Sequence, residues 1–298
     1  MPILCLGEAI VDLVCERAVE DLAQADAFRP HFGGAVANVA LTAAAQGAAV
    51  TLAGGAGDDP RGHWLRERLA AAGVGLDHFR LIPGCGTPLA LVTVRPDGEP
   101  RFQIYGDGIA ATVRAVGEEL PAAVAAAEAL FFSSNTLAGR TERDLTLAAR
   151  DRALELGRPV LFDPNLRLHR WPSLGEAVAE ANRCVPGALL VRCNRTEAEL
   201  MTGETDPERA AETLLDAGAR IVVVTLGADG ALLRGEASAR TPGCPARVVS
   251  TVGAGDVFTG VLLAHLAQSS FDPAAAAAGL PHAVRESARA TERWGAVE

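Results

Sequence analysis

The chain has 298 residues, of which 49% are hydrophobic and 21% are charged, and this composition excludes an intrinsically disordered protein. Its formal net charge of −10 argues against a general binder of nucleic acids or anionic membranes, although a local pocket could still hold an anionic substrate. All 27 basic residues are arginine, and the lack of lysine excludes both a P-loop phosphate site and Schiff-base catalysis.

Short apolar runs alternate with helical patterns along the chain. The run Ile221–Val224 has no polar alternation, which is typical of a strand buried on both faces of a parallel sheet. Residues 141–156 predict a helix, with Thr141 as its N-cap and Gly157 and Pro159 at its end. The alternation predicts an α/β fold with a doubly wound, mostly parallel sheet. The predicted strands are Met1–Leu6, Val50–Ala53, Ala129–Phe132, Pro159–Phe162, Ala188–Val191 and Arg220–Leu226.

Two segments depart from this alternation. Val11–Val19 follows the first strand with no helix stop, and Leu89–Val94 and Arg101–Tyr105 flank the turn sequence Pro96-Asp97-Gly98. In open α/β sheets, ligands bind at the carboxyl ends of the strands. We therefore expect one domain over residues 1–298, with a small β lid formed from about 11–32 and 86–108 above that edge.

The segment Val248–Leu262 is the strongest candidate for chemistry. We expect a strand to end near Val249, then Gly253-Ala254-Gly255, then an apolar helix that begins near Asp256. Unpaired N–H groups at a helix start, approached closely through glycine, form a phosphate site that needs no lysine. The Asp256 carboxylate could accept a proton from an attacking hydroxyl. The alternative is an aspartate that only complements the helix dipole.

Two earlier positions suit a sugar. Gly33-Gly34 precedes a predicted helix, and Asn38, one turn inside it, offers both a donor and an acceptor to a hydroxyl. Asp12 follows the first strand, and its carboxylate can accept hydrogen bonds from two adjacent hydroxyls. The alternatives are an ordinary glycine turn with a helical asparagine, and a surface aspartate.

Two later loops carry further candidates. Asn194 and Glu197 have the spacing of an N-cap and N3 residue, and on spacing alone we favour a helix cap over a phosphate or Mg²⁺ contact. In the turn sequence Asp163-Pro164-Asn165, followed by Leu166 and Arg167, the arginine could pair with an anion or lie on the surface.

The end of the strand Arg220–Leu226 is rich in glycine. Thr225, Gly227 and Gly230 would leave room for a nucleotide at the carboxyl edge of the sheet. The alternative is a tight hairpin turn into Ala231–Leu233, and we expect that turn in either case.

Taken together and in this order, these segments resemble the ribokinase-like (PfkB-type) carbohydrate kinases over nearly the whole chain. The stretches 33–38 (GGAVAN) and 250–256 (STVGAGD) are similar to the two family signatures, and 54–62 (GGAGDDPRG) is similar to a third motif between them. The stretch Phe162–Pro172 (FDPNLRLHRWP) is most similar to fructokinases, and 2-keto-3-deoxygluconate kinases share part of it.

The resemblance implies ATP-dependent phosphorylation of a sugar hydroxyl, with Mg²⁺ bound to ATP and fructose as the leading acceptor. It implies that Asp256 is the base and that the amides of Gly253, Ala254 and Gly255 surround the transferring phosphoryl group. The implied sugar contacts are Asp12, Gly33, Gly34, Asn38 and Arg167. The implied nucleotide contacts are Asn194, Glu197, Thr225, Gly227, Gly230 and Gly255, with Glu197 reaching Mg²⁺ through water and no residue binding the metal directly.

Three positions depart from the family pattern. Ser250 stands where an aspartate linked to a monovalent-cation site is usual, which leaves K⁺ activation open. Val284 replaces a polar residue near adenine, and Gly106 replaces a lid arginine of fructokinases. The alternatives are a 2-keto-3-deoxygluconate kinase, another furanose or nucleoside kinase, and an inactive sugar-binding or regulatory protein on the same fold. A Rossmann dehydrogenase would need a dinucleotide fingerprint that the sequence lacks.

The remaining features concern the protein's setting. The N-terminus has no basic region and no apolar run reaches 18 residues, so we expect a cytoplasmic protein without a signal peptide or membrane span. The exposed strand edges of a β lid predict a homodimer. The cysteines form no C-x-x-C pair and are expected to be buried thiols in a reducing compartment: Cys5, Cys15, Cys85, Cys184, Cys193 and Cys244.

Overall fold

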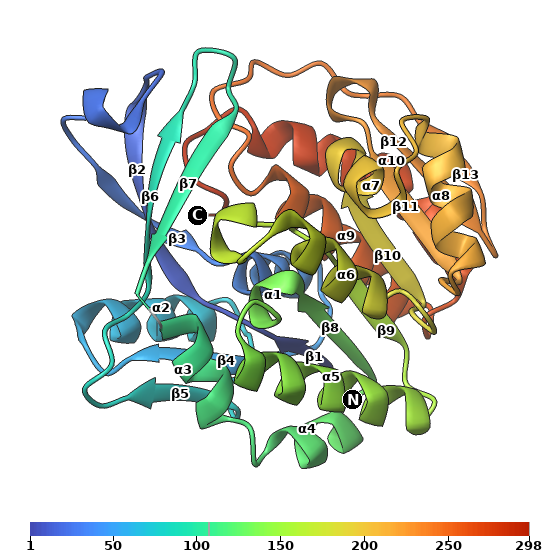
Figure 1. Cartoon of the computed structure of the whole chain (residues 1–298), viewed down its shortest axis with the longest axis horizontal. Helices are drawn as coiled ribbons and strands as arrows, with labels where there is room; N and C mark the ends of the chain where they lie inside the picture. Colours follow the sequence, from blue (N-terminus) through green and yellow to red (C-terminus); the bar gives the residue numbers. More distant parts are fainter. Residues whose placement is uncertain (107, 298) are drawn as a thin grey trace.

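A computed structural model describes residues 1–106 and 108–297 of the chain. Its centre is a nine-stranded sheet, drawn in Figure 1 with helices on both faces. All neighbouring strands from β5 to β11 are parallel, and only the edge strands β12 and β13 are antiparallel. This arrangement confirms the predicted α/β fold. In spatial order the strands are β13 (Ala239–Thr241), β12 (Ala231–Gly235), β11 (Ile221–Thr225), β10 (Leu190–Asn194), β9 (Val160–Asp163), β8 (Ala129–Ser133), β1 (Ile3–Leu6), β4 (Val50–Gly57) and β5 (Phe79–Ile82).

The sheet is apolar on both faces because its strands contribute to two cores. Along β1, Ile3 and Cys5 pack into one core, whereas Leu4 and Leu6 pack into the other. Helices α1 (Ala35–Ala45), α2 (Pro60–Ala71), α9 (Ala254–Gln268) and α10 (Pro273–Ala290) cover the first face. The second face is covered by α3 (Gly108–Ala115), α4 (Leu120–Ala126), α5 (Arg140–Glu155), α6 (Leu174–Arg183), α7 (Arg195–Thr202) and α8 (Pro207–Asp216).

A second, four-stranded sheet projects from one end of the molecule (Figure 1, blue and teal strands). Its order is β3-β2-β6-β7, with β2 and β6 parallel and both outer pairs antiparallel. The predicted hairpin is β6 and β7, joined through Gly98, which adopts a φ of 87°. Position 107 of the expected lid lies outside the described residues. The strands are β2 (Ile10–Ala18), β3 (Arg29–Gly33), β6 (Leu89–Val94) and β7 (Pro100–Tyr105).

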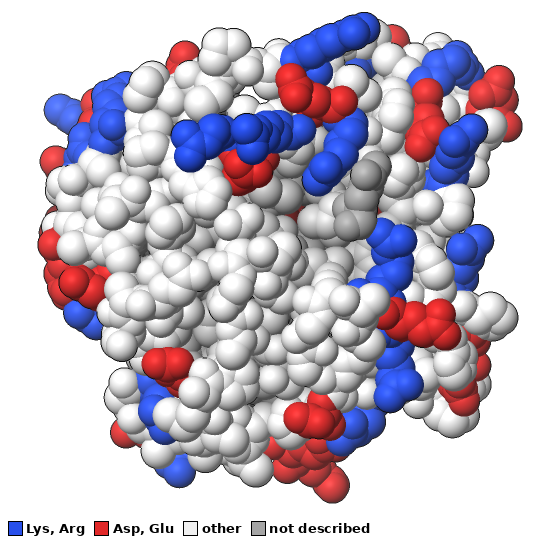
Figure 2. Space-filling model, turned by 180° about the vertical axis from the view of Figure 1, so that it is seen from behind, with Lys and Arg blue, Asp and Glu red and all other residues white. Residues whose placement is uncertain are grey.

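Single turns of 3₁₀ helix follow several strands of the two sheets: η1 (Leu22–Gln24), η2 (Ser134–Thr136), η3 (Leu168–Arg170) and η4 (Gly227–Asp229). None of the helices in the described ranges is both long and apolar enough to span a bilayer. On the face that Figure 2 shows, acidic and basic side chains alternate around the rim, and the middle is largely uncharged.

Three expectations are corrected by the structure. No strand ends near Val249, because the N–H groups of Val249 and Ser250 donate to the carbonyl of Thr291 at the end of α10 instead of to a neighbouring strand. Helix α5 is capped by Gly139 rather than Thr141, which lies inside its first turn. Not every cysteine is buried, since Cys85 is half-buried and Cys244 is exposed on an irregular loop; all six are free thiols.

Candidate active site

Polar side chains gather where five neighbouring strands end. Glu8 follows β1, Asn135 follows β8, Asn165 follows β9, Asn194 ends β10 and Thr225 ends β11. Because these strands are parallel and adjacent, their carboxyl ends meet at one edge of the sheet. They line a cavity of about 1190 Å³, which the first turns of α1 and α9, the loop 243–248 and strand β7 also border.

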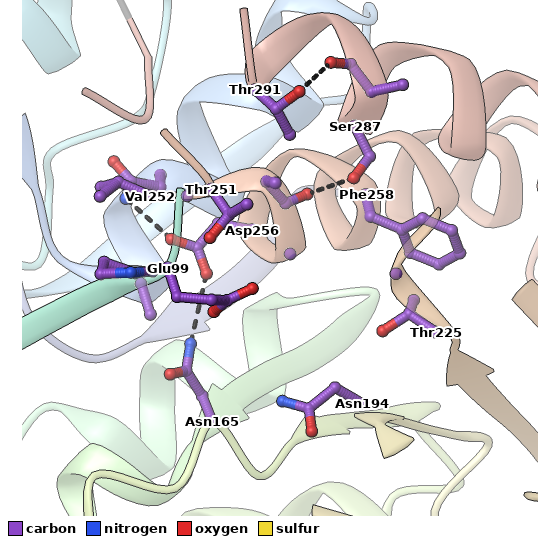
Figure 3. Close-up of a pocket in the computed structure, with 18 of the residues that line it drawn as sticks. Glu99, Asn165, Asn194, Thr225, Thr251, Val252, Asp256, Phe258, Ser287 and Thr291 are labelled. Carbon is purple, nitrogen blue, oxygen red and sulfur yellow. Dashed lines mark hydrogen bonds between the residues drawn. The ribbon is translucent and has the colours of Figure 1, made fainter. Parts of the chain in front are cut away.

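Asp256 lies in the first turn of α9, and its carboxylate is held from two sides. The side-chain amide of Asn38 donates to Oδ2 at 2.8 Å. The side-chain amide of Asn165 donates to Oδ1 at 3.2 Å (Figure 3). Asn165 has a φ of 41°, a left-handed conformation that asparagine tolerates better than most residues. Asp256 is 7% exposed, and this burial raises its pKa to about 7. A carboxylate with that pKa can accept a proton near neutral pH.

The N-terminus of α9 presents backbone donors beside Asp256. The N-cap Gly253 has a φ of 72°, and a Cβ there would overlap Ala296. Within the described residues, the N–H groups of Gly253, Gly255 and Asp256 have no hydrogen-bond partner, whereas the N–H of Ala254 lies 3.3 Å from the carbonyl of Thr251. Of the three predicted anion-hole amides, those of Gly253 and Gly255 are therefore open to an anion, and the Asp256 amide joins them.

The predicted sugar residues lie together at one end of the cavity. Asp12 is only 3% exposed, so it is not a surface aspartate. Gly33 has no side chain, which leaves room for the carboxyl group of Asp12. Gly34, with a φ of 98°, lies against the backbone of Glu8. Burial and the nearby charge of Asp256 raise the pKa of Asp12 to about 8. Asn38 is directed to Asp256 through its amide group, while its Oδ1 atom has no partner within the described residues.

Arg167 lies in the cavity and not on the outer surface. Its guanidinium carbon is 4.8 Å from the ring centroid of Phe102, a residue of β7 in the second sheet. Its positive charge lowers the pKa of both Asp12 and Asp256, opposing the larger effect of burial. Through Phe102, the second sheet therefore contacts Arg167. Among the described residues, Arg167 is the one half-buried cation near both Asp12 and Asp256.

Asn194 and Glu197 form a complete capping box at the start of α7. The Asn194 Oδ1 atom accepts the N–H of Glu197 at 2.9 Å, and Glu197 Oε2 accepts the N–H of Asn194 at 3.0 Å. Glu197 Oε1 accepts the N–H of Leu166 at 2.8 Å. The helix-cap interpretation is therefore correct, although both residues also line the cavity (Figure 3 shows Asn194).

Thr225, Gly227 and Gly230 form the expected hairpin turn from β11 into β12 and also line the cavity. Gly227 and Gly230 have φ values of 61° and 91°, so both need the freedom of glycine.

Within the described ranges, no group of three or more His, Cys, Asp or Glu side chains could hold a metal ion.

Several residues that the structure brings to this site were not predicted from the sequence. Arg192 forms a buried ion pair with Asp163 at 3.1 Å, and Thr259 donates to the same carboxylate oxygen at 2.8 Å. Arg192 also lies beneath Gly255, where a Cβ would contact its guanidinium group. A charged residue inside the apolar strand β10 is the signal that could have identified it. Glu8 and Asn135, like Asn165, could have been found from their positions after predicted strands.

The chain is similar to a family of carbohydrate kinases over most of its length. The model of a family described as pfkB family carbohydrate kinase matches residues 2–288. The chain is 32% identical over 263 residues to fructokinase-2 of Solanum habrochaites, covering 88% of this chain and 80% of that protein.

Solved structures of similar proteins cover almost the entire chain. A fructokinase from Vibrio cholerae O395, in a form with fructose, ADP and calcium bound, is 29% identical with a TM-score of 0.84, over 99% of this chain and 94% of that one. The aminoimidazole riboside kinase of Salmonella enterica, complexed with aminoimidazole riboside and an ATP analogue, is also 29% identical with a TM-score of 0.84, over 99% and 95%.

Proposed function

The chain belongs to the pfkB family of carbohydrate kinases, and on this premise we propose that it transfers the γ-phosphoryl group of ATP to a hydroxyl of fructose. The observation that carries the proposal is the position of Asp256, a buried carboxylate between two asparagine amides at the start of α9. Fructose is favoured because the similar proteins named above include fructokinases.

We propose the following roles for the residues at the centre of the cavity. The acceptor hydroxyl donates a hydrogen bond to the Asp256 carboxylate, which takes the proton as the oxygen attacks the γ-phosphorus and ADP leaves. The N–H groups of Gly253, Gly255 and Asp256 stabilise the charge on the transferring phosphoryl group. Asp12, Asn38 and Arg167 hold the sugar, with Gly33 and Gly34 shaping the backbone around it.

The other end of the cavity suits the nucleotide. We propose that Thr225, Gly227 and Gly230 border ATP, while Asn194 faces its phosphates. Mg²⁺ fits this site as an ion carried by ATP, since it keeps waters and phosphate oxygens as ligands. Bound there, it would neutralise charge on the β- and γ-phosphates. Each Glu197 oxygen already accepts a backbone N–H, so Glu197 would reach the ion through water only.

Ser250 has an uncharged side chain, so it offers no negative charge to a monovalent cation. It is fully buried, and its hydroxyl oxygen accepts the N–H of Val252 at 3.2 Å. We therefore propose that K⁺ does not change the rate of this kinase.

The test is ADP release from MgATP with fructose, ribose and 2-keto-3-deoxygluconate in separate assays, each with and without K⁺. We expect turnover with fructose and no response to K⁺. Asp256→Asn should lower kcat by roughly 10²- to 10⁴-fold, with fructose affinity by calorimetry changed little. Asp272→Asn is the matched control, because Asp272 caps α10 through its side chain and asparagine caps helices equally well.

Near-normal turnover by Asp256→Asn would contradict the proposed base. If no sugar gave ADP release while a sugar still raised the melting temperature, the protein would instead be a sugar-binding protein on this fold. Turnover of a nucleoside in preference to every sugar would favour the activity named for the Salmonella enterica relative.

A further inference from the structure

Glu8 is a buried carboxylate at the sugar end of the cavity, and none of the roles proposed above uses it. It lies in the loop between β1 and β2 and is 1% exposed. Its Oε1 atom accepts two hydrogen bonds, from the N–H of Ala35 at 3.0 Å and from the side-chain amide of Asn135 at 2.9 Å. Its Oε2 atom has no partner within the described residues, although Glu8 lines the cavity.

Asn135 is held in one orientation by a third residue. Arg170 donates from Nη1 to the carbonyl oxygen of Asn135 at 2.8 Å and to its Oδ1 atom at 3.2 Å. The Asn135 amide nitrogen is therefore directed to Glu8, and this contact fixes the Glu8 carboxyl group. A buried acceptor oxygen without a hydrogen-bond partner destabilises the protein, and a ligand that donates a hydrogen bond to it removes this cost.

Glu8 belongs to the same stretch of the cavity as the two aspartates. Burial is the largest cause of the raised pKa of Asp12, and the charges of Asp256 and Glu8 raise it further. Three carboxyl groups thus line the sugar end. The charge of Arg167 acts on Asp12 and Asp256, whereas the charge of Arg170, which also bonds Asn135, acts on Glu8.

From this geometry we propose that Glu8, oriented by Asn135 and Arg170, forms a subsite that binds one uncharged hydroxyl of the acceptor sugar other than the hydroxyl that is phosphorylated. The proposal rests on the proposed sugar kinase function and narrows its substrate class to neutral polyhydroxy sugars. A hydroxyl suits the site because it donates to a carboxylate and accepts from a carboxylic acid. A substrate carboxylate at this place would add a buried charge next to Glu8 and Asp12.

The experiment compares Glu8→Gln with the unchanged protein. Glutamine keeps the volume of the side chain and an oxygen for Ala35 and Asn135, but it replaces the carboxyl oxygen Oε2 with an amide nitrogen that only donates. We expect KM for fructose to rise roughly tenfold, with KM for ATP unchanged. The matched control is Glu180→Gln, which neutralises a largely buried carboxylate that pairs with Arg143 away from the cavity.

A panel of 1-deoxy-, 3-deoxy-, 4-deoxy- and 6-deoxyfructose identifies the hydroxyl by calorimetry. One analogue should bind the unchanged protein roughly tenfold more weakly than fructose does, yet bind the Glu8→Gln variant with the same affinity as it binds the unchanged protein. This coupling would not arise from a purely structural role of Glu8. If Glu8→Gln does not fold, Glu8→Asp keeps a carboxyl group, withdraws its oxygens by one methylene and should give the same coupling.

The outcomes separate this inference from the proposed function. Fructose turnover with a KM unchanged in Glu8→Gln, or with no analogue coupled to position 8, would overturn only the subsite. Turnover of ribose but not fructose, with the coupling to Glu8 present on deoxyribose analogues, would overturn fructose and support the subsite. Preference for 2-keto-3-deoxygluconate over every neutral sugar would overturn both.

Discussion

At the scale of single residues, burial decides the protonation of the site. Asp256 and Asp12 are both almost fully enclosed, and the loss of water around each carboxylate raises its pKa into the neutral range. The Asn38 hydrogen bond and the charge of Arg167 act in the opposite direction on Asp256. The working pH of the enzyme follows from this balance.

We predict that kcat/KM for fructose falls as the pH drops below about 7, because protonated Asp256 cannot accept the hydroxyl proton. Asn38→Leu removes a hydrogen bond that lowers the pKa of Asp256. The fall of kcat/KM at low pH should therefore begin at a higher pH in the Asn38→Leu variant than in the unchanged protein. Asn182→Ser is the control, since Asn182 bonds the carbonyl of Met201 far from the cavity. An acid limb that does not move in Asn38→Leu would exclude Asp256 as the titrating group.

Phe102 is predicted to position Arg167 through its ring face. Phe102→Leu keeps an apolar side chain but removes the cation–π contact, so KM for fructose should rise roughly 2- to 30-fold and the acid limb should shift upward. Phe102→Tyr retains the ring face and should restore both values. If leucine and tyrosine give the same kinetics, Arg167 is held by other contacts.

At the scale of secondary-structure elements, the start of α9 joins the catalytic base to the anion site. The Ser287 hydroxyl of α10 donates to the carbonyl of Ala254 at 2.9 Å, which ties the first turn of α9 to the neighbouring helix (Figure 3). The β6–β7 hairpin of the second sheet contacts the loop that precedes α9. There the N–H and the hydroxyl of Thr251 both donate to the carbonyl of Gly98. We propose that this sheet acts as a lid that excludes water during transfer.

Gly253→Ala tests the geometry of this helix start. The left-handed conformation costs a residue with a Cβ about 1–2 kcal/mol, and here the Cβ also overlaps Ala296. We predict a lower melting temperature and a fall in kcat of roughly 10²-fold or more, as for loss of an oxyanion-hole donor. Gly203→Ala, with a φ of 78° and open space around its Cβ, should lose stability but keep kcat. Equal kcat values for the two variants would contradict an anion site at Gly253.

At the scale of the whole molecule, β7 is an edge strand of the second sheet that pairs with no other described strand. The other edge strand, β3, meets residues near the C-terminus only at an isolated antiparallel bridge between Phe32 and Val297. Exposed strand edges invite pairing with another chain. We propose that two copies pair through this sheet, so that each covers the edge of the other. Light scattering at micromolar concentration should give twice the chain mass of 30.8 kDa. A monomeric mass would exclude this assembly.

The architecture and the family could be inferred from the sequence alone. Apolar strand runs such as Ile221–Val224 need burial on both faces, which is typical of a sheet between two layers of helices. In the structure this strand, β11, is parallel to β10 on one side and antiparallel to β12 on the other. The order of the glycine motifs around Asn38 and Asp256 indicated a carbohydrate kinase. Local spacing also predicted the cap at Asn194 and the hairpin after Thr225 correctly, because both depend on hydrogen bonds between near neighbours in the chain.

Which polar groups meet in the site depends on the tertiary fold. Strands β1 and β8 are neighbours in the sheet, so Glu8 contacts Asn135 across 127 positions, and Asn38 reaches Asp256 across 218. No local pattern encodes such pairs, because they depend on strand order. The pKa of Asp256 and the unsatisfied oxygen of Glu8 likewise arise from enclosure by several elements at once, and these two properties underlie the proposed chemistry and the proposed sugar subsite.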